Sequence, residues 1–370
     1  MSETKPDTAV PKYFLLKAML LPVIVIPALV ITFLVIRGDR AEQLYLRALD
    51  AAKRGDYAAA CADFARAGEL GHAESACNLA LIYQSGVVKV ENARELTEAN
   101  FLLAALNGSA QAEYELGKLA ESNAEPDYKQ AAMYYRSAAL AGLPEAMVAL
   151  GKLHEKGLGV NKSAELAKEF YGNAARSGCA AGAAELGLLY ASGELGEVDL
   201  SAARKALLSA AAMDYPRAFT ALGFICEQSN DMVYQAQAAE YYRQAAELND
   251  PEGMVNYGDY LKRRGQTADA LDLYLKAANE HNFHPAQHRA GLFYFSQSNP
   301  DYVLARKYFE RAAVQGNAAS WINLGIMAEL GHGFKADFKR ARECYSMAEK
   351  LGHSDAANHL RQLPPEPVGQ

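Results

Sequence analysis

Hydrophobic and small residues recur along most of this chain at the three- and four-residue spacings of amphipathic helices. One apolar pattern appears seven times, as in YELGKLA (114–120), VALGKLH (148–154) and INLGIMA (322–328). Its glycines, spaced by 34, 36, 36, 35, 33 and 34 residues, are Gly117, Gly151, Gly187, Gly223, Gly258, Gly291 and Gly325. A period of this length is typical of stacked helical hairpins, each of which buries its apolar faces against its neighbours.

A second pattern, seen in YYRSAALAG and YFERAAVQG, follows each of the first and contains two alanines seven residues apart with aromatic residues between them. Residues seven apart lie on one face of a helix. Each unit is therefore predicted to be a helix A, a turn, a helix B and a turn, in about nine pairs over 41–353. A glycine inside helix A costs about 1 kcal/mol relative to alanine, so we expect that it lets helix B approach closely.

The combined pattern A-x-x-x-L-G-x-x-Y, a G-x-G turn and W/Y-Y-x-x-A-A-x-x-G resembles the Sel1-like repeat, a relative of the tetratricopeptide repeat. The resemblance covers roughly 41–353, although several turns lack a clear G-x-G. It implies an all-α fold, a right-handed α/α superhelical solenoid of helix-turn-helix repeats. It also implies a non-catalytic scaffold that binds proteins or peptides in its concave groove. Residues 354–363 are predicted to form a C-terminal cap helix, and 364–370 a disordered tail.

If the register of the relatives carries over, the groove-facing positions of helix A lie three before, one after and four after each glycine. The residues selected in this way mix charged and aromatic side chains, which suits a protein or peptide partner. They are Tyr114, Lys118, Lys152, Glu155, Thr220, Phe224, Glu227, Asp259, Lys262, His288, Leu292 and Phe295.

The segment from Ala18 to Ile36 has nineteen residues without a charge. As a helix it would cover about 28 Å, close to the thickness of a bilayer core. Residues 13–37 are therefore predicted to form a transmembrane helix after a disordered cytoplasmic tail at 1–12. A cleaved signal peptide is the alternative, but the apolar run is long for one and no A-x-A-like site follows it.

The orientation of this segment is nearly balanced, because lysines precede it and arginines follow it. A weak preference places the amino terminus inside. The repeats would then lie on the extracytoplasmic side, in the periplasm if the protein spans a bacterial inner membrane once.

The net charge of −7 argues against a nucleic-acid partner. A nucleotide is also not expected. The stretch KGLGVNKSAELA (156–167) has glycines before a helix, but neither the spacing nor the preceding strand of a phosphate-binding loop. Gly157 and Gly159 are instead predicted to be turn residues with positive φ.

The five cysteines form no C-x-x-C pair and are most simply small buried residues, although Cys61 and Cys77 could pair in an oxidising compartment. His281, His284 and His288 have a spacing that could bind zinc. An enzyme or metal sensor using these residues is therefore one alternative function, and a structural spacer without a specific partner is another. No cofactor is predicted.

Overall fold

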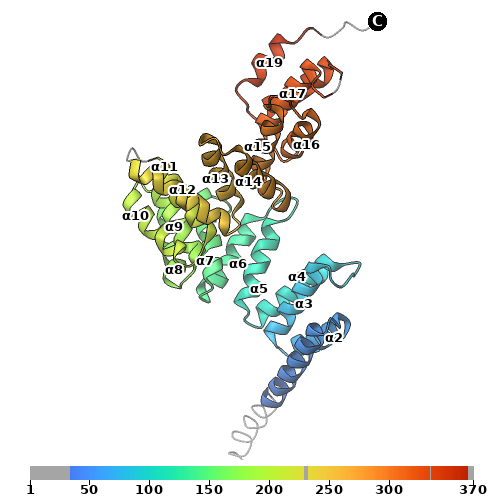
Figure 1. Cartoon of the computed structure of the whole chain (residues 1–370). Coiled ribbons are helices and arrows are strands. Elements are labelled where there is room, and N and C mark those ends of the chain that lie inside the picture. The colour runs from blue at the N-terminus through green and yellow to red at the C-terminus, as the bar shows by residue number, and fades with distance from the viewer. Residues whose placement is uncertain (1–33, 229–231, 334, 366–370) are drawn as a thin grey trace, which may run out of the picture. The chain divides into compact units, whose positions relative to one another are not determined.

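The computed structural model describes residues 34–228, 232–333 and 335–365 (Figure 1). The predicted tail at 1–12, the predicted membrane segment up to residue 33 and residues 366–370 of the predicted C-terminal tail lie outside the described residues. Every regular element in the described ranges is a helix, which confirms the all-α prediction. The chain divides after Ala174 into two compact units, which we call unit 1 and unit 2.

Unit 1 opens with a helix at residues 34–53 and continues as alternating A and B helices. They are α2 (Tyr57–Glu69), α3 (Ala73–Ser85), α4 (Ala93–Leu106), α5 (Ala110–Glu121), α6 (Tyr128–Leu140), α7 (Pro144–Lys156) and most of α8 (Ala164–Arg176).

Unit 2 repeats the same alternation. Its first five helices are α9 (Ala180–Ser192), α10 (Leu200–Ala211), α11 (Pro216–Glu227), α12 (Met232–Glu247) and α13 (Pro251–Arg263). They are followed by α14 (Thr267–Glu280), α15 (His284–Phe295), α16 (Tyr302–Ala313), α17 (Ala318–Leu330), α18 (Phe338–Lys350) and α19 (Ala356–Gln362).

Each helix packs mainly on its neighbours in sequence. Helix α5 contacts α6, α6 contacts α7, and in unit 2 the chain of contacts runs from α9 through α18, with α19 against α18. Successive A helices also contact each other: α11 contacts α13, and α13 contacts α15. Each unit is therefore a stack of helical hairpins, and the handedness of the predicted superhelix stays a prediction.

The turns follow from local chemistry. Asp127 accepts a hydrogen bond from the backbone N–H of Gln130 and so caps the start of α6. Gly157 and Gly159, between α7 and α8, have φ of +70° and +68°, a conformation that favours glycine. The prediction of a turn at 156–163 is confirmed.

The recurring alanines lie where helices meet. Ala131 and Ala138, seven residues apart on α6, are fully buried on either side of Tyr135. Small residues at these positions let neighbouring helices approach, and the aromatic ring fills the space between them.

The pairing of Cys61 with Cys77, left open by the sequence, is not formed in this structure, where both thiols are free. Cys61 packs against the cluster that contains Ala48 and Phe64. Cys77 belongs to the next cluster, with Phe101 and Leu116. The two side chains thus face different neighbours.

No helix within the described ranges is both long enough and apolar enough to cross a bilayer.

Candidate partner-binding surface

The recurring glycines of helix A lie against a large side chain of helix B. A Cβ atom at Gly151 would come within 2.6 Å of the ring of Tyr171, and one at Gly258 within 2.6 Å of the ring of Tyr274. Gly117, Gly223 and Gly325 face tyrosines of their own helix B in the same way. The expectation that these glycines permit close approach of helix B is confirmed.

The tyrosine in each of these pairs also donates its hydroxyl hydrogen to a carboxylate of helix A, usually four residues after the glycine. The bonds, between 2.6 and 3.0 Å long, are Tyr135 to Glu121, Tyr171 to Glu155, Tyr242 to Glu227, Tyr274 to Asp259 and Tyr345 to Glu329. Burial is the main cause, and the neighbouring carboxylate the second, that raises the pKa of Tyr135 and of Tyr242 well above the usual value for tyrosine. Each bond fixes the position of its carboxylate on helix A.

Two of the recurring glycines in unit 2 pack on a helix B residue without a hydroxyl, and no carboxylate follows four residues later. Phe309 packs on Gly291, and the position four residues after that glycine is Phe295. Leu207 packs on Gly187, where the corresponding position is Ala191. The carboxylate is present where helix B supplies a hydroxyl and absent where it does not. Its main role is therefore structural, as the acceptor of that hydroxyl.

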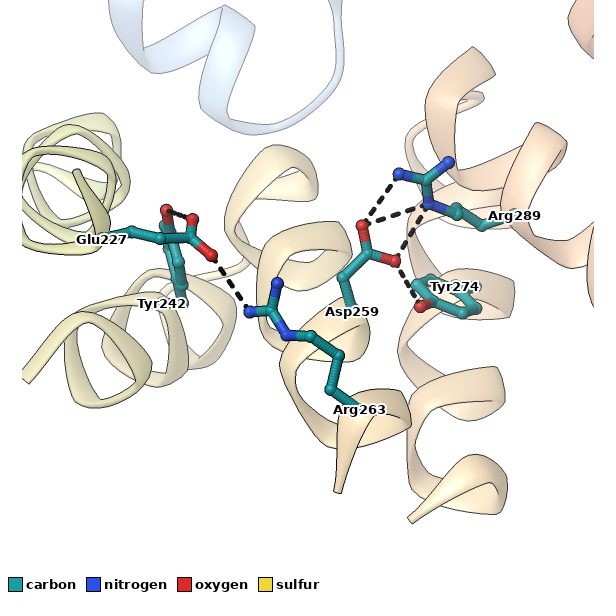
Figure 2. Close-up of polar contacts among 6 residues, drawn as sticks. All are labelled: Glu227, Tyr242, Asp259, Arg263, Tyr274 and Arg289. Atoms are coloured by element: carbon teal, nitrogen blue, oxygen red, sulfur yellow. Dashed lines mark hydrogen bonds and ion pairs between the residues drawn. The ribbon is translucent and has the colours of Figure 1, made fainter. Parts of the chain in front are cut away.

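The carboxylates also join successive A helices in unit 2 (Figure 2). Arg263 of α13 donates to Glu227 of α11 at 3.0 Å, and Arg289 of α15 donates through Nε and a terminal nitrogen to Asp259 of α13 at 2.9–3.1 Å. One step earlier, Arg217 of α11 pairs with Glu185 of α9 at 2.8 Å. Such partly exposed pairs contribute about 0–1 kcal/mol each, so they orient the charges more than they stabilise the fold.

We call the face made by Phe224, Glu227, Asp259, Lys262, Arg263 and Arg289 the α11–α15 face. Phe224 and Glu227 are three residues apart on α11, as are Asp259 and Lys262 on α13, so each pair lies on one side of its helix. Phe224 is 58% exposed, and Lys262 is exposed as well. This face combines an exposed aromatic ring with charges held in place by neighbouring helices.

Four of the predicted groove residues lie in unit 1. Tyr114 and Lys118 are together on α5, where the Lys118 ammonium lies 5.4 Å from the ring centre and pairs with Glu115. Lys152 and Glu155 are half-buried on α7, with Glu155 bound by Tyr171.

Two of the predicted groove residues are buried, which contradicts their placement on an open face. Thr220 is 4% exposed and donates to Asp250 at 2.7 Å, which links α11 to the start of α13. His288 is 9% exposed and lies 2.9 Å from the hydroxyl of Ser320. The position three before the glycine faces the next A helix, because successive A helices are in contact.

Leu292 and Phe295 are half-buried on α15. Phe295 packs edge-on against Tyr302 and Phe309 and also contacts His332, so its ring belongs to the interior of that repeat.

The three histidines do not converge. His288 faces Ser320, His284 faces Asn317 at 3.4 Å, and His281 forms no hydrogen bond through its buried Nε2 to any described residue. Across the described part of the chain no group of three His, Cys, Asp or Glu side chains could hold a metal ion. The zinc hypothesis for these residues is therefore not supported.

The tyrosines and arginines that bind the carboxylates were not predicted from the sequence. The tyrosines carried a signal, since a carboxylate at the first or fourth position after the glycine accompanies tyrosine but not phenylalanine or leucine at the packing position of helix B. Arg263 and Arg289 have no recurring position, because they lie five residues after one glycine and two before another.

The comparisons with known proteins agree with this architecture. Relatives include an uncharacterized protein of Neisseria meningitidis, 27% identical over 63% of this chain and 56% of its own. The yeast chitin synthase regulator of Saccharomyces cerevisiae is 36% identical over 30% of this chain and 17% of its own. The chain thus spans about half or less of the length of these curated relatives.

Two solved structures share the fold. A protective antigen of uropathogenic Escherichia coli is 26% identical, with a TM-score of 0.52 over 86% of this chain and 71% of that one. A Sel1 repeat protein from Oxalobacter formigenes has the same TM-score at 24% identity, over 81% of this chain and 88% of that one.

The Sel1 repeat model matches seven segments, which together make up more than half of the chain. They are 73–109, 110–143, 144–179, 222–250, 251–282, 284–317 and 322–353. The chain belongs to the Sel1 repeat family.

Proposed function

We propose that this protein is a membrane-anchored, non-catalytic scaffold that binds a protein or peptide through the α11–α15 face. Sel1 repeat proteins act in general as protein-interaction scaffolds, which supports the class of function. The observation that carries the choice of face is the ring of Phe224, 58% exposed beside charges that are already fixed by Arg263 and Arg289.

The chemistry of this face suits a peptide. An exposed aromatic ring provides apolar contact area, and aromatic residues, phenylalanine included, are enriched in interfaces. Because Glu227 and Asp259 are each held by a tyrosine and an arginine, little side-chain entropy remains to be lost when a partner arrives. Tyr114, Lys118, Lys152 and Glu155 offer a second candidate face in unit 1, whereas buried Thr220 and His288 are not part of either.

The membrane anchor rests on the uncharged sequence from Ala18 to Ile36 and on the exposed apolar turn Leu34, Val35 and Ile36 that opens the first described helix. Fusions at the carboxyl terminus test its topology. A reporter active only outside the cytoplasm should be active, and one that fluoresces only inside should stay dark. Recovery of the chain in the soluble fraction would remove the anchor from the proposal.

Partner binding is tested by a photo-crosslinking amino acid placed at Phe224 or Lys262 in the full chain. Lys276 provides the matched control, because it is an exposed lysine of unit 2 that lies on helix B. We expect the same partner to be captured from Phe224 and Lys262 and not from Lys276. No reproducible adduct, or equal capture from all three positions, would favour a structural spacer instead.

A further inference from the structure

A hollow of about 720 Å³ opens between the helix at 34–53 and α2. Arg40, Leu44 and Arg47 line it from the first helix, and Arg66, Glu69 and Leu70 line it from α2. We call it the arginine hollow.

Its positive charge is only partly neutralised. Arg47 binds both carboxylate oxygens of Asp63, so this pair is closed. Arg40 and Arg66 are exposed and form no ion pair with any described residue, and Glu69 supplies the facing carboxylate.

Arg37 adds an unused donor beside the hollow. One of its terminal nitrogens donates to the backbone carbonyl of Glu69 at 3.0 Å. Its Nε is buried and has no hydrogen-bond partner among the described residues. A buried donor without an acceptor is costly, although Arg37 itself does not line the hollow.

The hollow lies where the chain would leave the bilayer. The apolar turn Leu34, Val35 and Ile36 is 55–63% exposed and continues the uncharged sequence that begins at Ala18. From Ile36 to Arg40 a helix rises about 6 Å, which is roughly the depth of the headgroup layer on one side of a membrane. Arg37 and Arg40 would therefore lie at the level of the lipid phosphates.

The same edge of unit 1 carries two more exposed apolar residues. Helices α4 and α6 end there at Leu106 and Leu140, which are 85% and 84% exposed. Because helix A begins at the edge where helix B ends, these leucines lie at the edge of unit 1 where the A helices begin.

We propose that the arginine hollow binds the phosphate of an anionic phospholipid headgroup and so seats unit 1 on the membrane surface. This inference rests on the proposed membrane anchor. Guanidinium groups bind phosphate oxygens with two parallel hydrogen bonds, and basic residues next to a membrane segment are attracted to anionic lipid. The occupant is a lipid because the uncharged apolar sequence from Ala18 to Ile36 ends only four residues before Arg40, the first residue that lines the hollow.

The test uses the full chain in lipid nanodiscs and follows backbone hydrogen exchange. One set contains phosphatidylcholine alone, and in the other about one third of the lipid is phosphatidylglycerol. We expect phosphatidylglycerol to slow exchange at residues 37–47 and 66–71. The double variant Arg40→Gln, Arg66→Gln should lose this slowing.

A matched control removes the same charge from unit 1 away from the hollow. Lys129 and Arg136 are exposed on α6, and Lys129→Gln, Arg136→Gln should keep the lipid-dependent slowing. Exchange in α5 and α7, which lie in the same unit away from the hollow, is recorded in the same experiment and reports whether unit 1 of each variant is folded.

The outcomes separate the lipid site from the anchor. Equal exchange in the two lipid mixtures would overturn the lipid site even if the chain inserts into the discs. Equal slowing by inorganic phosphate in phosphatidylcholine discs would also overturn it, because the ligand would then be free phosphate. A chain that does not enter the discs at all would refute the anchor itself.

Discussion

The hydroxyl of Tyr171 donates a 2.6 Å hydrogen bond to Glu155, and the ring of the same tyrosine packs on Gly151, four residues before Glu155. One side chain of helix B thus contacts helix A at two points one turn apart. The ring requires glycine at the first point, and the hydroxyl requires a carboxylate at the second. The same pair of contacts recurs in other repeats, so it is a structural unit of this solenoid.

Tyr171→Phe should lower the free energy of unfolding by about 1–2 kcal/mol, because a hydrogen bond to a charged group is lost while the ring stays in place. Urea denaturation of the full chain measures this loss. In a double-mutant cycle with Glu155→Ala, which removes the acceptor, the two losses should not add, since both changes break the same bond. Full additivity would show that the hydroxyl and carboxylate do not act together.

Gly258→Ala should destabilise unit 2 by about 1–2 kcal/mol, although alanine is the better helix former by about 1 kcal/mol. The added Cβ would lie 2.6 Å from the ring of Tyr274, which cannot move away without breaking its bond to Asp259. Faster hydrogen exchange in α13 and α14 would report the change. Gly38→Ala is the control, because nothing lies within 4 Å of its new Cβ, and this variant should be neutral or slightly stabilised.

Much of this architecture could be predicted from the sequence, because the period of the glycines and alanines directly reflects helix packing. Gly157 and Gly159 likewise indicated a turn rather than a phosphate site. Which positions of helix A face the groove could be predicted less accurately. The position three before the glycine is buried at Thr220 and His288, since each A helix packs on the next. The acceptor roles of Glu155 and Glu227 depend on tyrosines some fifteen residues away, which only the packing of helix B identifies.

His288 should make unit 2 sensitive to acid. Burial, then Arg289 and His284, lowers its pKa to about 4, against about 6.5 in the unfolded chain. Between pH 6.5 and 4 the unfolded state therefore binds a proton that the folded state does not, and stability falls as the pH falls. The loss is at most about 3 kcal/mol for this shift.

Urea midpoints at pH 7.5 and pH 4.5 measure this effect. His288→Asn retains a polar group for Ser320 and cannot titrate, so its midpoint should depend less on pH than that of the wild type. An equal acid sensitivity in wild type and His288→Asn would assign the effect to other groups.

Phe224→Ala should separate binding from folding. Because the ring is 58% exposed, its removal should change the free energy of unfolding by less than about 0.5 kcal/mol. Phe309, which is fully buried against Gly291, is the matched control, and Phe309→Ala should cost about 3–5 kcal/mol. If the α11–α15 face binds the partner, Phe224→Ala should abolish capture from a crosslinker at Lys262 while the urea midpoint stays unchanged. Capture at the wild-type level would show that the exposed ring of Phe224 does not contact the partner, and the binding face would then have to lie elsewhere on the solenoid.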